Sequence, residues 1–410
     1  MKAIMLAIGN EVVNGDIVNT NAAYISDYLK KFGIETICHI AVTDKKNHII
    51  KSIEKSLKKA DLIMITGGLG PTFDDITKKS VADALGLKLI KDIKSEEKIK
   101  DYFVRLGKPM SELNRVQCYF PMGAVIIPNN SGTAPGAIIK TGEKAVMMFP
   151  GPPSELKPML ESDEVIKQLN SMRKGYIKEK VLKFFGIGES SLCEILSEEL
   201  VSSKDLTAAT YIETGEVKVK ITARAEGMDE ASRMAEELAE KIKEKAGEYI
   251  YSEENENLQE AIVRKLTDKN LSLITVESCT GGLIGKKITE VSGSSVVYKG
   301  GLITYSNEMK KMLCGVKDES LDAFGAVSKA VCEEMAEGAR LRYNADISVS
   351  VTGVAGPGCS EDKPAGLVYI GVSTKDKTEG VRFNFNGNRE KVREQSAKNA
   401  LYAVLKIINK

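Results

Sequence analysis

Histidine is almost absent from this sequence of 410 residues. Only His39 and His48 occur, so the chain after residue 48 has no imidazole. A serine or cysteine nucleophile needs a group that takes up its proton, and that group is commonly a histidine. Any such nucleophile later in the chain therefore needs another base, for which Lys310 is the candidate.

Paired cysteines, long apolar runs and a strong net charge are also missing. The seven cysteines are scattered without a CxxC spacing, which argues against a zinc site or a disulfide framework and indicates free thiols in a reducing cytoplasm. No apolar run approaches the roughly 18 residues of a membrane span, so we expect a soluble, cytoplasmic protein. The formal net charge of +1 argues against a general nucleic-acid binder.

The length and the order of apolar segments predict two or three domains of the α/β class. Residues 1–165 alternate apolar strand patterns with helical patterns, which predicts a parallel sheet covered by helices. Residues 257–410 show the same alternation. Between them, residues 166–252 predict a small α+β module, since Val217, Val219 and Ile221 alternate with polar residues as in a half-buried strand. We expect two α/β/α sandwich domains joined by this module.

The stretch from Val276 to Lys310 is rich in glycines and small hydroxyl residues. It follows an apolar run at 271–276 that predicts a strand, and a helical pattern begins after Gly282. The free N–H groups at a helix start favour anions, so this junction is a candidate ligand site. Taken singly, each residue also has a structural explanation: Ser295 as a turn residue, Tyr305 as a packed strand residue and Lys310 as a solvated helix residue.

A glycine-rich loop in the first domain, Gly67-Gly68-Leu69-Gly70-Pro71-Thr72, follows an apolar strand and precedes a helical pattern. Open α/β sheets bind phosphates at such loops, although this one is neither a Walker A nor a GxGxxG motif. Asp74 and Asp75 follow it. Two acids beside a phosphate site suit Mg²⁺, but either acid can equally well cap the next helix.

The motifs together resemble the CinA family of competence/damage-inducible proteins over essentially the whole chain. In the first domain they are Gly9-Asn10-Glu11, Asn19-Thr20-Asn21, the glycine-rich loop with Asp74-Asp75, and Phe149 to Glu155. In the last domain they are Glu277 to Gly282, Gly293-Ser294-Ser295, Thr304 to Asn307 with Lys310, Gly325 to Ser328, Gly353 to Gly358, and Gly387-Asn388-Arg389. The segment Cys359 to Asp362 departs from the family pattern, in which glycines are more frequent.

The resemblance implies that the last domain deamidates nicotinamide mononucleotide to nicotinic acid mononucleotide and ammonia without a cofactor. Amide hydrolysis needs a nucleophile, a base that later protonates the leaving amine, and donors for the oxyanion. We assign Ser295 as nucleophile, with Ser278 as runner-up, and Lys310 as base. Tyr305 is expected either to relay a proton or to hydrogen-bond the Lys310–Ser295 pair. The pKa of Lys310 must then lie below its ordinary value of about 10.4. Cys279 ranks third, because no downstream histidine is present to generate a thiolate.

The expected substrate-binding residues of this domain include oxyanion donors near Gly281-Gly282 or Gly353, and Arg389 or Arg393 for the nucleotide phosphate. The full set is Thr280, Gly281, Gly282, Thr352, Gly353, Gly356, Arg389 and Arg393.

For the first domain the resemblance implies a molybdopterin-binding-like fold and a metal-dependent ADP-ribose pyrophosphatase. Gly67, Gly68, Gly70 and Thr72 are the expected phosphate-binding residues. Asp75 is the leading metal residue, Asp44 matches the second acid of the molybdopterin-binding relatives, and Asp74 and Glu11 are further candidates. The expected cofactor is a divalent cation, Mg²⁺ first. The loop at 128–136 either bounds the same pocket or is an ordinary surface turn.

The middle module resembles a KH domain, but no two of its glycines are three residues apart. It therefore lacks the GXXG loop that clamps nucleic acid, and we expect a spacer or dimerisation module in a homodimer. Two other hypotheses stay open. The chain is a non-catalytic adaptor in competence or DNA repair, or its first domain only binds a pterin or nucleotide.

Overall fold

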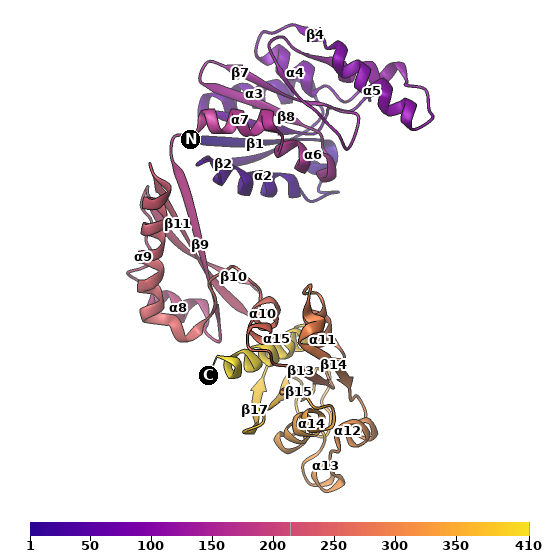
Figure 1. Ribbon diagram of the computed structural model, residues 1–410, viewed down its shortest axis with the longest axis vertical. Coiled ribbons are helices and arrows are strands. Elements are labelled where there is room, and N and C mark those ends of the chain that lie inside the picture. The colour runs from indigo at the N-terminus through magenta and orange to yellow at the C-terminus, as the bar shows by residue number, and fades with distance from the viewer. Residues whose placement is uncertain (214, 410) are drawn as a thin grey trace. The chain divides into compact units, whose positions relative to one another are not determined.

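The computed structural model in Figure 1 describes residues 1–213 and 215–409. The chain divides into two compact units, Met1–Lys178 with Ala223–Met234, and Glu179–Thr222 with Ala235–Lys410. Three main sheets are formed by successive stretches of the chain. The α/β fold class predicted from the sequence is confirmed, whereas the exact domain boundaries remain predictions. None of the described helices is both long and apolar enough to span a membrane.

The first sheet has six strands in the order β2-β1-β3-β8-β7-β6. β1, β2, β3 and β8 run parallel, as predicted. At one edge β7 pairs antiparallel with β8, and β6 pairs antiparallel with β7. The strands are β1 (Lys2–Ile8), β2 (Glu35–Val42), β3 (Leu62–Thr66), β6 (Val125–Ile127), β7 (Gly136–Thr141) and β8 (Lys144–Phe149), with a separate pair β4 (Leu89–Lys91) and β5 (Tyr119–Pro121). The helices are α1 (Asn10–Asn14), α2 (Thr20–Lys30), α3 (Lys46–Lys59), α4 (Thr77–Ala84), α5 (Ile93–Arg105), η1 (Glu112–Cys118), α6 (Pro153–Leu160) and α7 (Asp163–Met172).

Helices cover both faces of this sheet because its central strands are apolar on both sides. In β1, Ala3 and Met5 pack with residues of α2, α6 and α7, whereas Ile4 and Leu6 pack with residues of α3 and α4. Successive side chains of a strand point to opposite faces, so an uninterrupted apolar strand indicates a sheet that is buried on both sides.

The middle sheet has the order β10-β11-β9-β12. In β11, Val217, Val219, Ile221 and Ala223 are buried, in agreement with the predicted alternation. Its elements are β9 (Tyr176–Phe185), α8 (Glu189–Ile195), β10 (Leu206–Glu213), β11 (Glu216–Ala225), α9 (Met228–Ala246), η2 (Gly247–Tyr249) and β12 (Ile250–Ser252).

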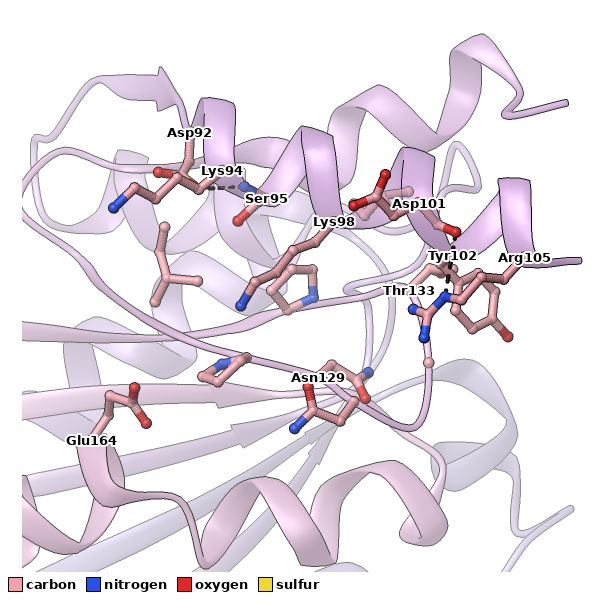
Figure 2. Close-up of a pocket in the computed structure, with 16 residues that line it drawn as sticks. Asp92, Lys94, Ser95, Lys98, Asp101, Tyr102, Arg105, Asn129, Thr133 and Glu164 are labelled. Atoms are coloured by element: carbon pink, nitrogen blue, oxygen red, sulfur yellow. Dashed lines mark hydrogen bonds between the residues drawn. The ribbon is translucent and has the colours of Figure 1, made fainter.

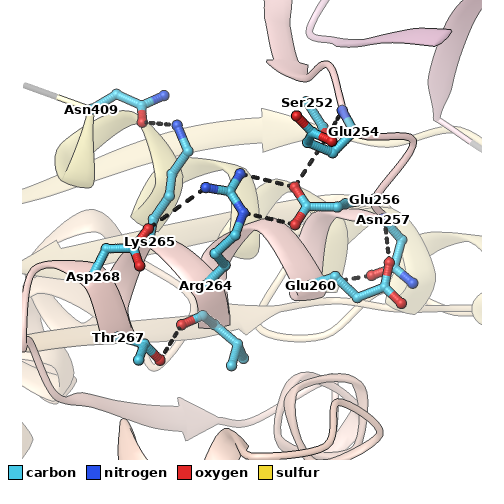
Figure 3. A network of polar contacts seen from close by, with 11 residues as sticks. Ser252, Glu254, Glu256, Asn257, Glu260, Arg264, Lys265, Thr267, Asp268 and Asn409 are labelled. Atoms are coloured by element: carbon cyan, nitrogen blue, oxygen red, sulfur yellow. Dashed lines mark hydrogen bonds and ion pairs between the residues drawn. The ribbon is translucent and has the colours of Figure 1, made fainter. Parts of the chain in front are cut away.

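The polar run after β12 is held by side chains of helix α10 (Leu258–Asp268). Arg264 contacts Glu256 through two hydrogen bonds, of 2.8 and 2.9 Å. Asn257 and Glu260 form a reciprocal capping box at the start of the helix. Figure 3 shows this network, which gives the run an ordered path into the last domain.

The last sheet has the order β14-β13-β15-β16-β17, with β13 parallel to both of its neighbours and the remaining pairs antiparallel. Its strands are β13 (Leu273–Glu277), β14 (Tyr298–Ile303), β15 (Ile347–Gly353), β16 (Leu367–Ser373) and β17 (Thr378–Asn384). Its helices besides α10 are α11 (Leu283–Thr289), η3 (Ser294–Val296), α12 (Asn307–Cys314), α13 (Asp318–Phe324), α14 (Lys329–Arg342) and α15 (Arg389–Ile408).

Successive side chains of β13 point to opposite faces of the sheet and so contact different helices. Leu273 packs with residues of α10, α11 and α15, whereas Ile274 and Val276 pack with residues of α12 and α14. α12 and α14 approach closely at Gly338, where even a Cβ atom would clash with the carbonyl oxygen of Cys314. This crossing fixes the position of α12 beside the end of β13.

Candidate functional sites

The amine of Lys310 is buried at the carboxyl end of the last sheet. Lys310 lies on α12 and only 2% of its surface is exposed. Its Nζ donates to the carbonyl oxygen of Thr304, at 3.0 Å, and to Ser278 Oγ, at 3.4 Å. A lysine amine and a serine hydroxyl are thus within hydrogen-bonding distance of each other.

The strand pattern explains why Ser278 meets Lys310. Ser278 directly follows β13, and its backbone N–H continues the ladder by donating to Val351 O at 3.0 Å. Because Ile274 and Val276 face α12 and α14, the alternation of side chains directs Ser278 to the same side. Thr304, the other partner of Lys310, follows the neighbouring strand β14 and donates its N–H to Glu277 O at 2.8 Å.

Burial lowers the pKa of Lys310 below its ordinary value, and the negative charge of Glu361 opposes this shift. Desolvation disfavours the charged ammonium form. The site therefore increases the fraction of neutral amine, which is the form that can accept a proton from Ser278.

Glu277 holds the turn that carries Ser278. Its buried carboxylate accepts hydrogen bonds from the backbone N–H groups of Gly282, Ile284 and Gly285, at 2.9, 3.1 and 2.8 Å. The N–H of Gly281 donates to Ser278 O at 3.1 Å. The amides of Gly281 and Gly282 are therefore already bonded within this turn, which favours Gly353, the other predicted oxyanion donor.

Ser295 lies at the other end of the sheet, so the prediction that it is the nucleophile beside Lys310 is wrong. It belongs to η3, which precedes β14, and Val297 O accepts from the N–H of Leu273, the first residue of β13. Five strand residues separate this end from Ser278, which is roughly 16 Å. Its neighbours Ser292 and Val296 line a separate cavity with Glu256 and Arg264.

A cavity of about 560 Å³ opens over Lys310 and Ser278. Of the predicted substrate-binding residues, Thr352, Gly353, Gly356 and Arg389 line it. The whole lining is Ser278, Cys279, Tyr305, Ser306, Asn307, Lys310, Ala326, Val327, Thr352, Gly353, Val354, Ala355, Gly356, Gly358, Cys359, Ser360, Glu361 and Arg389.

Tyr305 and Arg389 form a pair at this cavity. Arg389 donates to Tyr305 Oη at 3.3 Å and to Gly356 O at 2.8 Å. Tyr305 is 64% exposed, and no hydrogen bond joins it to Lys310 or Ser278 in the described part of the chain. The structure thus pairs Tyr305 with the predicted phosphate-binding arginine, not with the base that it was predicted to assist.

The remaining predicted residues either belong to the turn that carries Ser278 or bind its backbone. Arg393 donates to the carbonyl oxygens of Cys279 and Thr280, at 3.2 and 2.6 Å. Arg393, Thr280, Gly281 and Gly282 are not among the residues that line the cavity, so their direct contact with a substrate is not supported. Burial raises the pKa of the Cys279 thiol to about 11, which keeps it protonated and argues against a cysteine nucleophile.

Sequence reasoning missed Glu361. Its carboxylate accepts from the N–H groups of Ala326 and Val327, at 3.1 and 3.3 Å, and from Lys363 Nζ at 3.0 Å. Glu361 and Asp362 have positive φ angles of 53° and 55°, so a residue type other than glycine occupies a left-handed turn here. The sequence signal was the departure from the glycine-rich family pattern at this segment.

In the first domain the predicted phosphate and metal residues line one cavity of about 350 Å³. The residues that line it include Gly67, Gly68, Gly70, Thr72, Glu11, Asp44, Asp74 and Asp75, together with Thr133, Ala134 and Glu155. Gly67 has φ 93°, and a Cβ there would clash with Ile8 O, so the loop must pass this close to β1. The predicted contribution of the loop at 128–136 agrees with the positions of Thr133 and Ala134.

Neither Asp74 nor Asp75 caps α4. The N-cap residue is Ile76, which makes no side-chain cap bond. Asp75 instead closes the glycine-rich loop, accepting from Thr72 N–H at 2.9 Å and from the Thr72 hydroxyl. Asp44 accepts from Asn10 N–H at 2.9 Å.

The acids of this cavity suit a cation that is also bound by a substrate phosphate better than a cation bound by protein side chains alone. Across residues 1–213 and 215–409, no three His, Cys, Asp or Glu side chains are grouped closely enough to hold a metal. Mg²⁺ commonly takes one or two carboxylates and completes its shell with water and substrate phosphate oxygens. Asp75 and Asp44, on the same cavity as the glycine-rich loop, suit that mode.

Lys78 and Gln117 lie behind this loop and were not predicted. Lys78 is buried, donates to Gln117 O at 2.6 Å and lies 4.0 Å from the centre of the Phe120 ring. Burial lowers its pKa to about 7. Gln117 Nε2 donates to Leu69 O and Thr133 Oγ1, at 3.5 and 3.3 Å, which ties the loop to residue 133.

Three family models match the chain in succession. They are a probable molybdopterin binding domain over residues 4–169, the damage-inducible protein CinA KH domain over residues 179–252, and the CinA C-terminal domain over residues 255–408.

Relatives match over the full length. A putative competence-damage inducible protein of Caldicellulosiruptor saccharolyticus is 44% identical over 409 residues, which cover 100% of this chain and 99% of the relative. One from Clostridium botulinum is 42% identical over 402 residues, with 98% of each chain covered. Among solved structures, competence/damage inducible protein CihA from Agrobacterium tumefaciens is 38% identical over 37% of this chain and 94% of its own, with a TM-score of 0.36.

Proposed function

Because the chain belongs to the CinA family, with a molybdopterin-binding-like domain and a CinA C-terminal domain, we propose that it is a hydrolase of pyridine-nucleotide recycling. The C-terminal domain deamidates nicotinamide mononucleotide to nicotinic acid mononucleotide and ammonia. The observation that carries this proposal is the contact of a buried lysine amine, whose pKa is lowered, with a serine hydroxyl at the floor of a cavity.

In the first half of the proposed reaction, Ser278 Oγ attacks the carboxamide carbon and Lys310 Nζ takes up the hydroxyl proton. The tetrahedral intermediate collapses when Lys310 returns that proton to the leaving nitrogen, and ammonia departs. In the second half, Lys310 takes a proton from water, the water oxygen attacks the acyl-serine, and the proton returns to Ser278 Oγ. Nicotinic acid mononucleotide is released and both groups regain their initial state.

Gly353 is the proposed donor to the oxyanion. Val351 bonds to Ser278 on the β13 side, and Val354 N–H bonds to Leu367 O on the β16 side. Backbone groups of a strand alternate from side to side with each residue, so Gly353 directs its N–H toward the turn that carries Ser278. A donor in that place would stabilise the charge that develops on the carboxamide oxygen.

Arg389 is the proposed phosphate ligand of this domain. It lines the cavity and already contacts Tyr305 and Gly356 O. A guanidinium binds phosphate oxygens through paired hydrogen bonds, and the cavity of about 560 Å³ is within the size range of small-molecule sites.

Ammonia release is the direct test. The purified full-length chain, incubated with nicotinamide mononucleotide, is expected to release one ammonia for each nicotinic acid mononucleotide formed, with EDTA present or absent. The products are measured by a coupled ammonia assay and by chromatography. A chain that releases no ammonia but shifts DNA in a mobility assay would instead support the adaptor hypothesis.

For the first domain we propose a Mg²⁺-dependent ADP-ribose pyrophosphatase. The glycine-rich loop would hold the phosphates, and Asp75 and Asp44, with Asp74 and Glu11 nearby, would hold the cation. When bound, the cation supplies charge stabilisation to the phosphoryl group. Asp75 closes the loop and so keeps the phosphate site in shape.

Asp75→Asn is expected to lower ADP-ribose hydrolysis at least about 100-fold, because the charge stabilisation of a metal contributes several kcal/mol. EDTA should abolish the wild-type activity and Mg²⁺ should restore it. The matched control is Asp83→Asn, since Asp83 lies on the following helix and pairs with Lys46 at 2.6 Å. Tight binding of ADP-ribose without turnover would instead favour the binding-only hypothesis.

We further propose a homodimer in the cytoplasm, without nucleic-acid binding. All seven cysteines are free, which suits a reducing compartment. The missing GXXG loop in the middle module supports a role in assembly over a role in nucleic-acid binding.

A further inference from the structure

A second cavity in the first domain is not used by either proposed site. It has a volume of about 520 Å³ and lies between α5 and the loop at 128–135 (Figure 2). Lys94, Lys98, Tyr102 and Arg105 line it from α5. Their spacing of four, four and three residues places them on one face of that helix.

The end of this groove near Arg105 is cationic. Lys94, Lys98 and Arg105 form no ion pair within the described residues, whereas Lys100 on the same helix lies 3.5 Å from Glu96. Figure 2 shows Lys98 and Arg105 reaching from α5 toward the strand-and-loop segment opposite, with Arg105 beside Thr133.

Three acids also line the groove, but they do not neutralise that end. Asp92 caps α5 by accepting from Ser95 N–H at 2.7 Å. In Figure 2 the carboxylate of Asp101 lies on the side of α5 away from Thr133, and Glu164 lies at the opposite end of the groove from Arg105.

The groove shares a wall with the cavity at the glycine-rich loop. Thr133 lines both. Asn129, in the groove, donates to Glu155 of the other cavity at 2.6 Å. Gly132 lets the loop pass Glu155 so closely that a Cβ atom would clash with its carboxylate. The two cavities therefore adjoin at Thr133, and a ligand that occupies both has to cross at this residue, with one phosphate on the side of the glycine-rich loop and the other on the side of the groove.

We propose that this groove binds the nucleoside monophosphate half of a pyrophosphate-linked nucleotide, such as ADP-ribose, whose other half lies over the glycine-rich loop. The inference rests on the proposed pyrophosphatase function and names its second subsite. Arg105 and Lys98 provide cationic donors for the phosphate oxygens. The Tyr102 ring provides a face for the base, because stacking on an aromatic ring is favourable for any base.

The test is the binding of adenosine 5′-monophosphate to the full-length chain by calorimetry without added metal. Arg105→Ala and Tyr102→Ala are each expected to weaken binding about tenfold, which is the usual scale for one such contact. Arg115→Ala is the matched control, because Arg115 lies outside the groove and pairs with Glu112 at 3.1 Å. Circular dichroism confirms that the variants are folded.

Kinetics with ADP-ribose separates this subsite from the pyrophosphatase itself. Arg105→Ala should raise KM about tenfold and leave kcat within about twofold, since the contact is the same in the ground and transition states. The proposed nucleotide subsite would be overturned if the variants bind the monophosphate like the wild type, or if the wild type does not bind it at millimolar concentration. A third outcome is possible. If Arg105→Ala loses monophosphate binding but the wild type never hydrolyses ADP-ribose, the nucleotide subsite is supported and the pyrophosphatase function is overturned.

Discussion

Replacing Ser278 with alanine is expected to lower the deamidation of nicotinamide mononucleotide at least about 1,000-fold, because the reaction loses the atom that attacks the carboxamide. Ser278 Oγ accepts a hydrogen bond from the buried amine of Lys310. The fold should survive, since removing one hydroxyl leaves the Ser278 N–H bonded to Val351 O. The measurement is the rate constant of ammonia release in a single turnover.

Ser295→Ala is the control within the same chain, and its rate should stay within about twofold of the wild type. Ser295 is exposed and lies at the amino end of β14, so its hydroxyl cannot reach the substrate of a site at the carboxyl end. The opposite ranking of the two variants would contradict the structural assignment. A covalent acyl intermediate trapped on Ser278 and identified by mass spectrometry would establish the nucleophile directly.

Lys310→Met should lower the same reaction about 100-fold to 10,000-fold, the usual contribution of a general base. Methionine fills a similar volume and carries no amine, so the buried space remains occupied. Lys311→Met is the matched control, because Lys311 is exposed and pairs with Asp318 at 2.8 Å. Retention of substrate binding by Lys310→Met, measured by calorimetry, would separate lost chemistry from lost affinity.

The pH dependence gives this prediction a second readout. Lys310 acts as a base only when its amine is neutral, so kcat/KM should rise with pH through the pKa of Lys310. Because burial lowers that pKa, the rise should be centred below the ordinary value of about 10.4. Glu361 opposes the shift, so Glu361→Gln should move the rise to lower pH. A profile without an ionisation in this range, or an unchanged profile in Glu361→Gln, would argue against an amine base.

The fold was predictable because its signals are local. The α/β alternation, the parallel core of the first sheet and the half-buried strand β11 all follow from the period of apolar residues. The residues of the glycine-rich loop were predicted to share one site and do line one cavity, since strand ends and loops of one sheet edge meet at the same place.

Nearness in sequence to Lys310 does not predict nearness in space here. Ser295 precedes Lys310 more closely than Ser278 does, but all of β14 lies between Ser295 and Lys310 and carries the chain from the amino end of the parallel strands to their carboxyl end. Ligands of open α/β sheets bind at the carboxyl ends of the strands. That rule selects Ser278, which follows a strand, over Ser295, which precedes one.

Several side-chain contacts of the site were not predictable from the sequence. Glu277 looks like part of a short motif, and only the structure shows its carboxylate bound to three backbone amides. Glu361 meets Ala326 and Val327 from a distant loop, and the hydrophobic pattern has no signal for such a contact. The same holds for Tyr305, whose partner Arg389 is 84 residues away.

The crossing of α12 and α14 at Gly338 ties the proposed Lys310–Ser278 pair to a residue that does not line the cavity above it. Any side chain at that position would push α12 outward, and the amine of Lys310 would travel with the helix while Ser278 stayed on the sheet. A chain altered only there would lose the contact between Lys310 and Ser278 on which the proposed chemistry depends, although every residue that lines the cavity is unchanged.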